Sequence, residues 1–158
     1  MSAKWKTILI VSVVVAGGLM FYVNSRILNG AGVTPPIPVA SDSSSEISWT
    51  YNKLQDALQL SAQTGRPVMA DFYADWCGWC KKLDSDTYTD PGVVQKSKYF
   101  VCVKLNADVC RDESAKYGVR GLPTIVFLDS GGKVLDKQVG YTDAQNLLSL
   151  MSKQSKVK

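Results

Sequence analysis

Residues 71–82 read DFYADWCGWCKK, and they place Cys77 and Cys80 between a strand pattern and a helix pattern. Two cysteines in a C-x-x-C arrangement serve either redox chemistry or metal binding. Their position favours redox chemistry, because a thiol at a helix N-terminus faces unsatisfied backbone N–H groups and the positive end of the helix dipole. Both effects stabilise a thiolate, so we expect Cys77 to be the reactive nucleophile. Cys80 follows one turn later, where it can resolve a mixed disulfide.

The remaining cysteines, Cys102 and Cys110, argue against a zinc site. They are separated by seven residues and the chain has no histidine, whereas a structural zinc site needs two closely spaced ligand pairs. We therefore predict no metal and no cofactor beyond the redox-active disulfide Cys77–Cys80. Cys102 lies in the middle of a predicted strand, which favours a small buried core residue over a reactive thiol. A Cys102–Cys110 disulfide is the alternative, and it requires the chain to fold back until the two Cα atoms lie within ~7 Å.

The chain around this motif alternates between strand and helix patterns. The predicted strands, recognised by β-branched and aromatic residues, are 67–74, 99–105, 124–128 and 133–139, the last two joined by a hairpin turn at 129–132. The predicted helices, recognised by apolar spacing and by Gly and Pro stop signals, are 49–64, 77–87, 90–94, 112–117 and 142–151. Thr142 is the expected cap of the last helix. This order predicts an α/β fold with a central mixed β-sheet flanked by helices.

The N-terminal segment carries a separate signal. Residues 7–25 contain no charged side chain, and a helix that crosses a bilayer needs ~20 apolar residues. Lys4 and Lys6 precede this run, so the positive-inside rule places residues 1–6 in the cytoplasm and the catalytic domain on the extracytoplasmic (periplasmic) side. We therefore predict a single-pass transmembrane signal-anchor in the cytoplasmic membrane. The alternative is a signal peptide cleaved near residues 16–18, which read Ala-Gly-Gly.

The rest of the chain divides by composition into three parts. Residues 26–47 are rich in proline and serine and predict a flexible linker. Residues 48–152 form the predicted folded domain, and residues 153–158 a basic tail. The domain contains twelve basic and twelve acidic residues, although the whole chain has a net charge of +4. A nucleic-acid-binding face needs a local basic excess, so nucleic acid is not an expected partner.

Three separated motifs together resemble the thioredoxin family. Besides residues 71–82, they are VKLNAD at 103–108 and KYGVRGLPTIVFLD at 116–129. The phrase YADWC, followed by KK and then by DTYTDP, is most similar to the C-terminal thioredoxin-like domains of DsbD-type disulfide-interchange proteins. The likeness covers residues 49–151 in matching order. It implies a thioredoxin fold and thiol:disulfide oxidoreductase activity.

The resemblance also implies roles for two charged residues. Asp71 matches the family's buried carboxylate beneath the dithiol, which accepts a proton from the resolving cysteine, here Cys80. Burial on an apolar strand raises the pKa of a carboxyl group towards the operating pH, which suits that role. Lys104 matches a lysine that approaches this carboxylate. The alternatives are an ordinary surface aspartate at position 71 and a solvated lysine at a strand end at position 104.

The residues that the resemblance assigns to substrate binding surround the dithiol. Pro123 matches the family's cis-proline opposite the cysteines, which leaves the backbone of Leu122 to pair with an extended substrate strand. Trp76 matches a tryptophan beside the nucleophile and is expected on the docking surface. Gly78 and Trp79, between the cysteines, complete the predicted set. The alternatives are a simple turn proline at position 123 and a core-packing role for Trp76.

The dipeptide Gly78-Trp79 bears on the direction of electron flow. The family commonly has Gly-Pro here, and oxidising relatives often carry a histidine whose imidazolium stabilises the thiolate. A less stabilised thiolate gives a more reducing couple. We therefore expect a protein-disulfide reductase of exported proteins, with apocytochrome c or periplasmic thioredoxin-like carriers as candidate clients. A membrane or periplasmic electron-donor protein would re-reduce the dithiol. The alternatives are an extracytoplasmic dithiol oxidase or isomerase, and a non-catalytic binding module.

Overall fold

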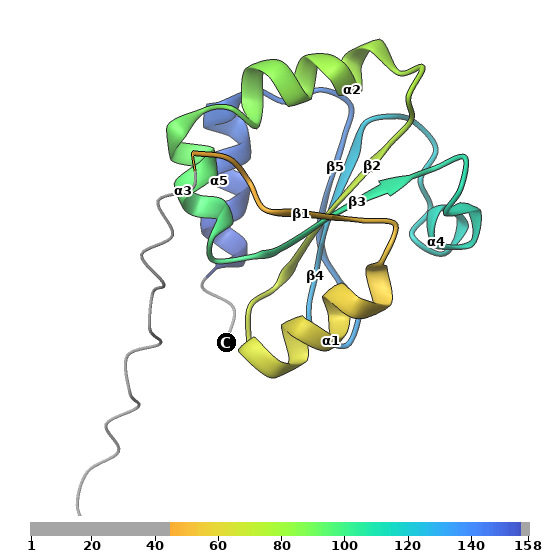
Figure 1. The fold of residues 1–158 in the computed structure, drawn as a ribbon, viewed down its shortest axis with the longest axis vertical. Coiled ribbons are helices and arrows are strands. Elements are labelled where there is room, and N and C mark those ends of the chain that lie inside the picture. The colour runs from red at the N-terminus through yellow and green to blue at the C-terminus, as the bar shows by residue number, and fades with distance from the viewer. Residues whose placement is uncertain (1–44, 156–158) are drawn as a thin grey trace, which may run out of the picture. The chain divides into compact units, whose positions relative to one another are not determined.

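A computed structural model describes residues 45–155, which form a five-stranded sheet with helices on both faces (Figure 1). The predicted N-terminal segment, signal-anchor and most of the predicted linker lie outside the described residues. Among the helices that are described, none has the length and apolar character needed to cross a membrane.

The sheet is mixed, as the strand and helix order predicts. Its order is β1-β3-β2-β4-β5; β1, β3 and β2 run parallel, while β4 is antiparallel to both β2 and β5. The strands are β1 (Trp49–Tyr51), β2 (Val68–Tyr73), β3 (Val101–Asn106), β4 (Thr124–Leu128) and β5 (Val134–Val139). The central strand β2 therefore leads directly from the middle of the sheet to the C-x-x-C motif.

Helical segments connect the strands and cover both faces. They are α1 (Leu54–Thr64), α2 (Gly78–Lys82), the π-helical continuation η1 (Leu83–Thr87), α3 (Pro91–Ser97), α4 (Arg111–Lys116) and α5 (Ala144–Gln154). Asp90 caps α3, because its carboxylate accepts hydrogen bonds from the Gly92 and Val93 amides. The helix predicted over residues 77–87 is observed as one continuous helical stretch, α2 followed by η1, and its second half has π-helical geometry.

Side chains of β2 alternate between the two faces of the sheet, as the pleat requires. Met69 enters one core with Leu147 and Met151 of α5, and Phe72 enters the other with Leu54 of α1. Figure 1 shows α3 and α5 on one side of the sheet and α1 on the other. The first core also receives Cys102 of β3. Asp71 and Lys104 are two residues away from Met69 and Cys102 on their strands, so they point to this same face.

The prediction that a helix begins at Trp49 is wrong. Residues 49–51 form β1, which pairs with β3 so that Trp49 aligns with Cys102. The sequence Trp-Thr-Tyr has high strand propensity. The chain then turns at Asn52, whose φ of 53° lies in the left-handed region, and α1 starts at Leu54. The apolar spacing of α1 was read one turn too far towards the N-terminus.

The boundaries of the domain also differ from the prediction at both ends. Thr142 does not cap the last helix; Asp143 does, because its carboxylate accepts the Asn146 amide at 2.8 Å. The helix continues to Gln154 rather than ending at Met151. At the other end, Ile47 lies within the predicted linker, but the structure buries it in the core beside α3 and α5. Local sequence signals fix such limits poorly because tertiary packing adds residues on either side.

Candidate active site

The two cysteines of the motif are joined in a disulfide at the start of α2. Cys77 is the N-cap residue, and its Sγ accepts a hydrogen bond from the Cys80 amide at 3.1 Å. The Cys77 amide in turn donates to the Ala74 carbonyl at 3.0 Å, which ties the motif to the end of β2. Both cysteines are buried, in a small cluster with Ala74, Tyr73 and Leu122. The predicted position of Cys77 at a helix N-terminus is confirmed.

Pro123 lies next to this cluster, and the Leu122–Pro123 peptide bond is cis, as the resemblance implied. Leu122 is half-buried against the cysteines. The Pro123 carbonyl accepts a hydrogen bond from the Gly140 amide at 2.8 Å, whereas the Leu122 amide and carbonyl make no backbone hydrogen bond within residues 45–155. The Leu122 amide and carbonyl are therefore not engaged by the backbone of the domain itself.

Two exposed tryptophans flank the disulfide. Trp76 is 71% exposed, and its indole N–H donates to Asp108 Oδ2 at 2.9 Å. The interpretation of Trp76 as a core residue is therefore wrong. Trp79 is 60% exposed and packs against Tyr141, with ring centroids 5.8 Å apart. Gly78 is exposed between the cysteines, and a side chain there would meet no atom within 4 Å.

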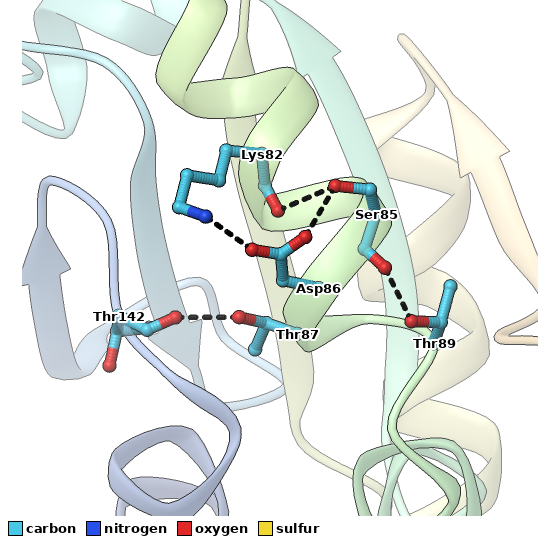
Figure 2. A network of polar contacts seen from close by, with 6 residues as sticks. All are labelled: Lys82, Ser85, Asp86, Thr87, Thr89 and Thr142. Carbon is cyan, nitrogen blue, oxygen red and sulfur yellow. Dashed lines mark hydrogen bonds and ion pairs between the residues drawn. The ribbon is translucent and has the colours of Figure 1, made fainter.

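A polar network ties the helix of the dithiol to the segment that carries Tyr141 (Figure 2). The Thr87 hydroxyl donates to the Thr142 carbonyl at 2.7 Å. Lys82 forms an ion pair with Asp86, and its ammonium lies 5.4 Å from the Tyr141 ring centroid. These contacts position Tyr141 beside Trp79, a pairing that local sequence patterns do not reveal because the two residues are far apart in the chain.

Asp71 and Lys104 form an ion pair inside the domain. They are aligned partners on β2 and β3, and Lys104 Nζ lies 3.2 Å from Asp71 Oδ2. Asp71 is 1% exposed and Lys104 is 5% exposed, so both interpretations as surface residues are wrong. Burial raises the pKa of Asp71 to about 6, although the Lys104 ammonium opposes this shift. Asp71 is therefore a carboxyl group that changes protonation near neutral pH.

Lys104 also contacts Asp84, a residue that sequence reasoning missed. Lys104 Nζ donates a hydrogen bond to Asp84 Oδ1, so this one ammonium joins the carboxylates of β2 and of η1. Burial acts to lower the pKa of Lys104, but the Asp71 and Asp84 carboxylates outweigh it and raise that pKa. The available signal was spacing: Asp84 follows Cys80 by four residues, which places both on one face of a helix.

Aromatic rings surround the Lys104 ammonium. The ring centroids of Trp49, Tyr73 and Tyr88 lie 5.3, 5.1 and 5.3 Å from its Nζ. The negative faces of such rings stabilise a buried cation. Lys104 therefore stays charged inside the domain, next to the carboxyl group that titrates.

Cys102 and Cys110 are free thiols, so the alternative of a disulfide between them is wrong. They belong to different cores on opposite faces of the sheet, Cys102 with α3 and α5 and Cys110 with α1. The prediction that Cys102 is a buried core residue is confirmed. Within residues 45–155, no three His, Cys, Asp or Glu side chains gather where they could hold a metal ion.

A disulfide at a helix N-terminus, a cis-proline beside it and a buried carboxyl group on the central strand define a thioredoxin-like thiol:disulfide oxidoreductase. The thioredoxin-like domain family matches residues 54–155, and the chain belongs to this family.

Individual relatives agree with this assignment. The chain is 42% identical over 98 residues to the thiol:disulfide interchange protein DsbD of Vibrio vulnificus, covering 56% of this chain and 16% of that protein. It is 35% identical over 88 residues to a thioredoxin of Mycoplasmoides gallisepticum, covering 56% of this chain and 84% of the thioredoxin. The oxidised C-terminal domain of Neisseria meningitidis DsbD has a similar fold, with a TM-score of 0.57 and 23% identity over 64% of this chain and 92% of that domain.

Proposed function

We propose that this chain is a membrane-anchored protein-disulfide reductase that acts on exported proteins. The observation that carries the proposal is the Cys77–Cys80 pair at the start of α2, on the same domain as the titratable Asp71. The DsbD relatives are thiol:disulfide interchange proteins by name, and this chain spans about a sixth of the length of the one from Vibrio vulnificus. The predicted signal-anchor at residues 7–25 supports an extracytoplasmic position.

In the first step, the Cys77 thiolate attacks one sulfur of a substrate disulfide. A Cys77–substrate S–S bond forms, the substrate S–S bond breaks, and one substrate thiolate leaves. Substrate approach over the exposed face of Trp76 and Trp79, with an extended segment paired to the Leu122 backbone, would align the three sulfur atoms.

In the second step, Cys80 resolves the mixed disulfide. Its thiol gives its proton to Asp71, and the resulting thiolate attacks Cys77 Sγ. The Cys77–Cys80 bond forms and the second substrate thiolate leaves, so two electrons have passed from the protein to the substrate. Asp71 suits this role because a carboxyl group with a pKa of about 6 is mostly ionised at neutral pH, yet basic enough to take a proton. Lys104 and Asp84 then hold the carboxylate in place as positioning residues.

Turnover requires a reductant that the chain does not contain. A dithiol electron-donor protein in the membrane or periplasm would reduce the Cys77–Cys80 disulfide by the reverse exchange. Candidate clients are apocytochrome c and periplasmic thioredoxin-like carriers. Gly78-Trp79, with no histidine between the cysteines, favours reductase over oxidase or isomerase activity, because no imidazolium stabilises the thiolate.

The reduction potential of the dithiol tests the proposal. The full 158-residue chain, purified in detergent micelles, is equilibrated in dithiothreitol or glutathione buffers, and the reduced fraction is read by thiol trapping. We expect a value more negative than about −200 mV, near the −270 mV of thioredoxin. A value near −120 mV would identify an oxidase instead. If the chain reduces insulin no faster than free dithiothreitol does, it is a binding module.

A further inference from the structure

Two buried polar atoms in the part of the chain that the structure describes have no hydrogen-bond partner: Asp71 Oδ1 and the Tyr88 hydroxyl oxygen. Buried polar groups are almost always paired, because an unpaired one loses its hydrogen bonds to water without replacement. Both atoms belong to the cluster around Lys104. Their exposed fractions are only 1% for Asp71 and 5% for Tyr88. Two unpaired buried polar atoms in one cluster are unusual for a folded domain.

Packing holds the ring of Tyr88. Tyr88 follows η1 directly, and its ring meets Trp49 edge to face, with centroids 5.0 Å apart. The same ring lies 5.3 Å from Lys104 Nζ. These contacts explain the position of the ring, but they do not explain why the side chain carries a hydroxyl group.

The two unpaired groups act on each other electrostatically. Burial, and then the Asp71 charge, raise the pKa of Tyr88 well above its ordinary value, so the hydroxyl stays protonated. Burial raises the pKa of Asp71, while Lys104 and then the Tyr88 hydroxyl act to lower it. A neutral hydroxyl can lower the pKa of a carboxyl group by donating to its ionised form. The hydroxyl therefore lies close enough to the carboxyl group to act on its charge, and neither Asp71 Oδ1 nor the Tyr88 hydroxyl oxygen has another hydrogen-bond partner.

The other groups that face this carboxyl are few. Lys104 approaches from β3, and Asp84 approaches from η1 through Lys104. Cys102 on β3 also lies close enough to influence Tyr88. The buried residues of the two helices α3 and α5 are all uncharged: Val93, Val94, Ser97, Leu147, Met151 and Gln154.

We propose that Tyr88 is a positioning residue for Asp71: its hydroxyl donates a hydrogen bond to Oδ1 of the ionised carboxylate and keeps it ready to take the Cys80 proton. This inference rests on the proposed function, because it assigns a partner to the proton acceptor of that cycle. Lys104 then forms the ion pair with Asp71 Oδ2, and the Tyr88 hydroxyl donates to Asp71 Oδ1. When the proton of the Cys80 thiol arrives on Asp71, the hydroxyl can accept from the carboxylic acid instead, since a phenol both donates and accepts.

The direct test is the titration of Asp71 in the Tyr88→Phe variant. Phenylalanine keeps the ring against Trp49 and Lys104 and removes only the hydroxyl. Asp71 is titrated in the full 158-residue chain in detergent micelles, in the oxidised state, by ¹³C NMR of labelled aspartate. We expect the midpoint to rise by about one pH unit, since a hydrogen bond to a charged group is lost.

Tyr117→Phe is the matched control. Tyr117 is also buried, but it packs in the core on the other face of the sheet, and its hydroxyl donates to the Gly132 carbonyl at 3.3 Å. Loss of that hydroxyl should leave the Asp71 midpoint unchanged. Coincident midpoints in Tyr88→Phe, Tyr117→Phe and the unmodified chain would overturn the proposal.

A kinetic test separates this inference from the proposed function. The reduced chain reacts with an aromatic disulfide, 5,5′-dithiobis(2-nitrobenzoate), and the second release of thionitrobenzoate reports attack by Cys80. In Tyr88→Phe the acid limb of that rate should move to higher pH, giving about fivefold slower release at pH 6 and recovery in alkali. If Tyr88→Phe slows release equally at every pH, the substitution has caused only structural damage, and the inference is overturned. If the unmodified chain shows no exchange, the proposed function fails, and the Asp71 titration still decides the Tyr88 contact.

Discussion

The domain holds two pairs of cysteines whose burial is almost the same and whose chemistry is not. Cys77 and Cys80 are 5% and 2% exposed, and Cys102 and Cys110 are 5% and 7% exposed. Burial alone therefore does not separate a reactive dithiol from inert thiols. What differs is the backbone around the sulfur atoms and the charges nearby.

The first pair lies where the backbone supplies donors. Cys77 caps α2, and the Cys80 amide points at its sulfur. Cys102, in contrast, lies within β3, and its thiol has only a 3.8 Å contact to the Ser97 carbonyl, which is an acceptor. Burial raises the pKa of Cys102 to about 12, against a small opposing effect of Arg66. Burial and then Glu113 raise the pKa of Cys110.

Donors facing the sulfur therefore decide reactivity in the domain. A carbonyl or a carboxylate near a thiol disfavours the thiolate, whereas an amide N–H favours it. The two pairs also differ in whether their two members can come together. Cys80 is one helical turn from its partner, while Cys102 and Cys110 are separated by the sheet itself.

The largest effect is expected from substitution of the first pair. Cys77→Ser should reduce insulin-reduction activity to the rate of the added thiol alone. Within residues 45–155 no backbone amide hydrogen-bonds to the sulfur of Cys102 or of Cys110, even though Cys110 is the N-cap residue of α4. Cys80→Ser is the paired variant. It should still attack but not release, so mass spectrometry should find a stable mixed disulfide at Cys77. Full activity in either variant would mean that Cys102 or Cys110 can replace the first pair.

An intermediate effect is expected from Asp71→Asn, which removes the proposed proton acceptor of Cys80. Release of the second substrate thiol should slow on the order of 10²-fold at neutral pH, since general base catalysis is lost.

The same residue should make the free energy of unfolding of the unmodified chain depend on pH. Because the folded pKa of Asp71 is about 6 and its ordinary value is 3.8, the folded state binds the extra proton between these values. Stability therefore falls as pH rises from ~4 through 6, by up to ~3 kcal/mol.

Urea unfolding checks this sign. Between pH 4 and 8 the unmodified chain should lose more unfolding free energy than Asp71→Asn, whose amide does not titrate. Asp75→Asn is the control, because Asp75 is an exposed aspartate at the end of the same strand region. Equal pH dependence in Asp71→Asn and the unmodified chain would show that Asp71 ionises normally in the folded state.

The smallest effect is expected from the second pair. Cys102→Ala and Cys110→Ala should keep activity within about twofold and lower the unfolding free energy by ~1 kcal/mol, the usual result of a small core truncation. Brief alkylation of the reduced native chain at pH 8 should label Cys77 and spare Cys102. Labelling of Cys102 at a comparable rate would contradict the role assigned to burial and backbone acceptors.

Much of the fold follows from local patterns in the sequence. Residues 124–128 are predicted and observed as a strand with the same ends, because β-branched residues lie between a proline and a glycine turn. Cys77 and Cys80 were found because their spacing at a strand-to-helix junction has a direct chemical consequence. The prediction placed Trp49 in a helix because its spacing from Leu54 fits the helical period, although the residue also fits a strand.

The residues around Lys104 were harder to find. Asp71 and Lys104 were matched by resemblance, and their ion pair depends on the parallel register of β2 and β3. Tyr88 and Trp49 gave no chemical signal on their own, because each is a common core residue type. Tyr141 pairs with Trp79 across 62 positions of chain, through a contact fixed by the Thr87–Thr142 hydrogen bond.

The redox motif, the alternation of strands and helices, and the strand on which the acidic residue lies all follow from the amino-acid order alone. These are short-range properties, set by backbone preference and by the spacing of side chains. The charges that meet Asp71, the position of Tyr88 in the same cluster, and the division of the second cysteine pair by the sheet are set by the three-dimensional packing. Those facts depend on strand register and on desolvation, and both arise only when distant segments pack together.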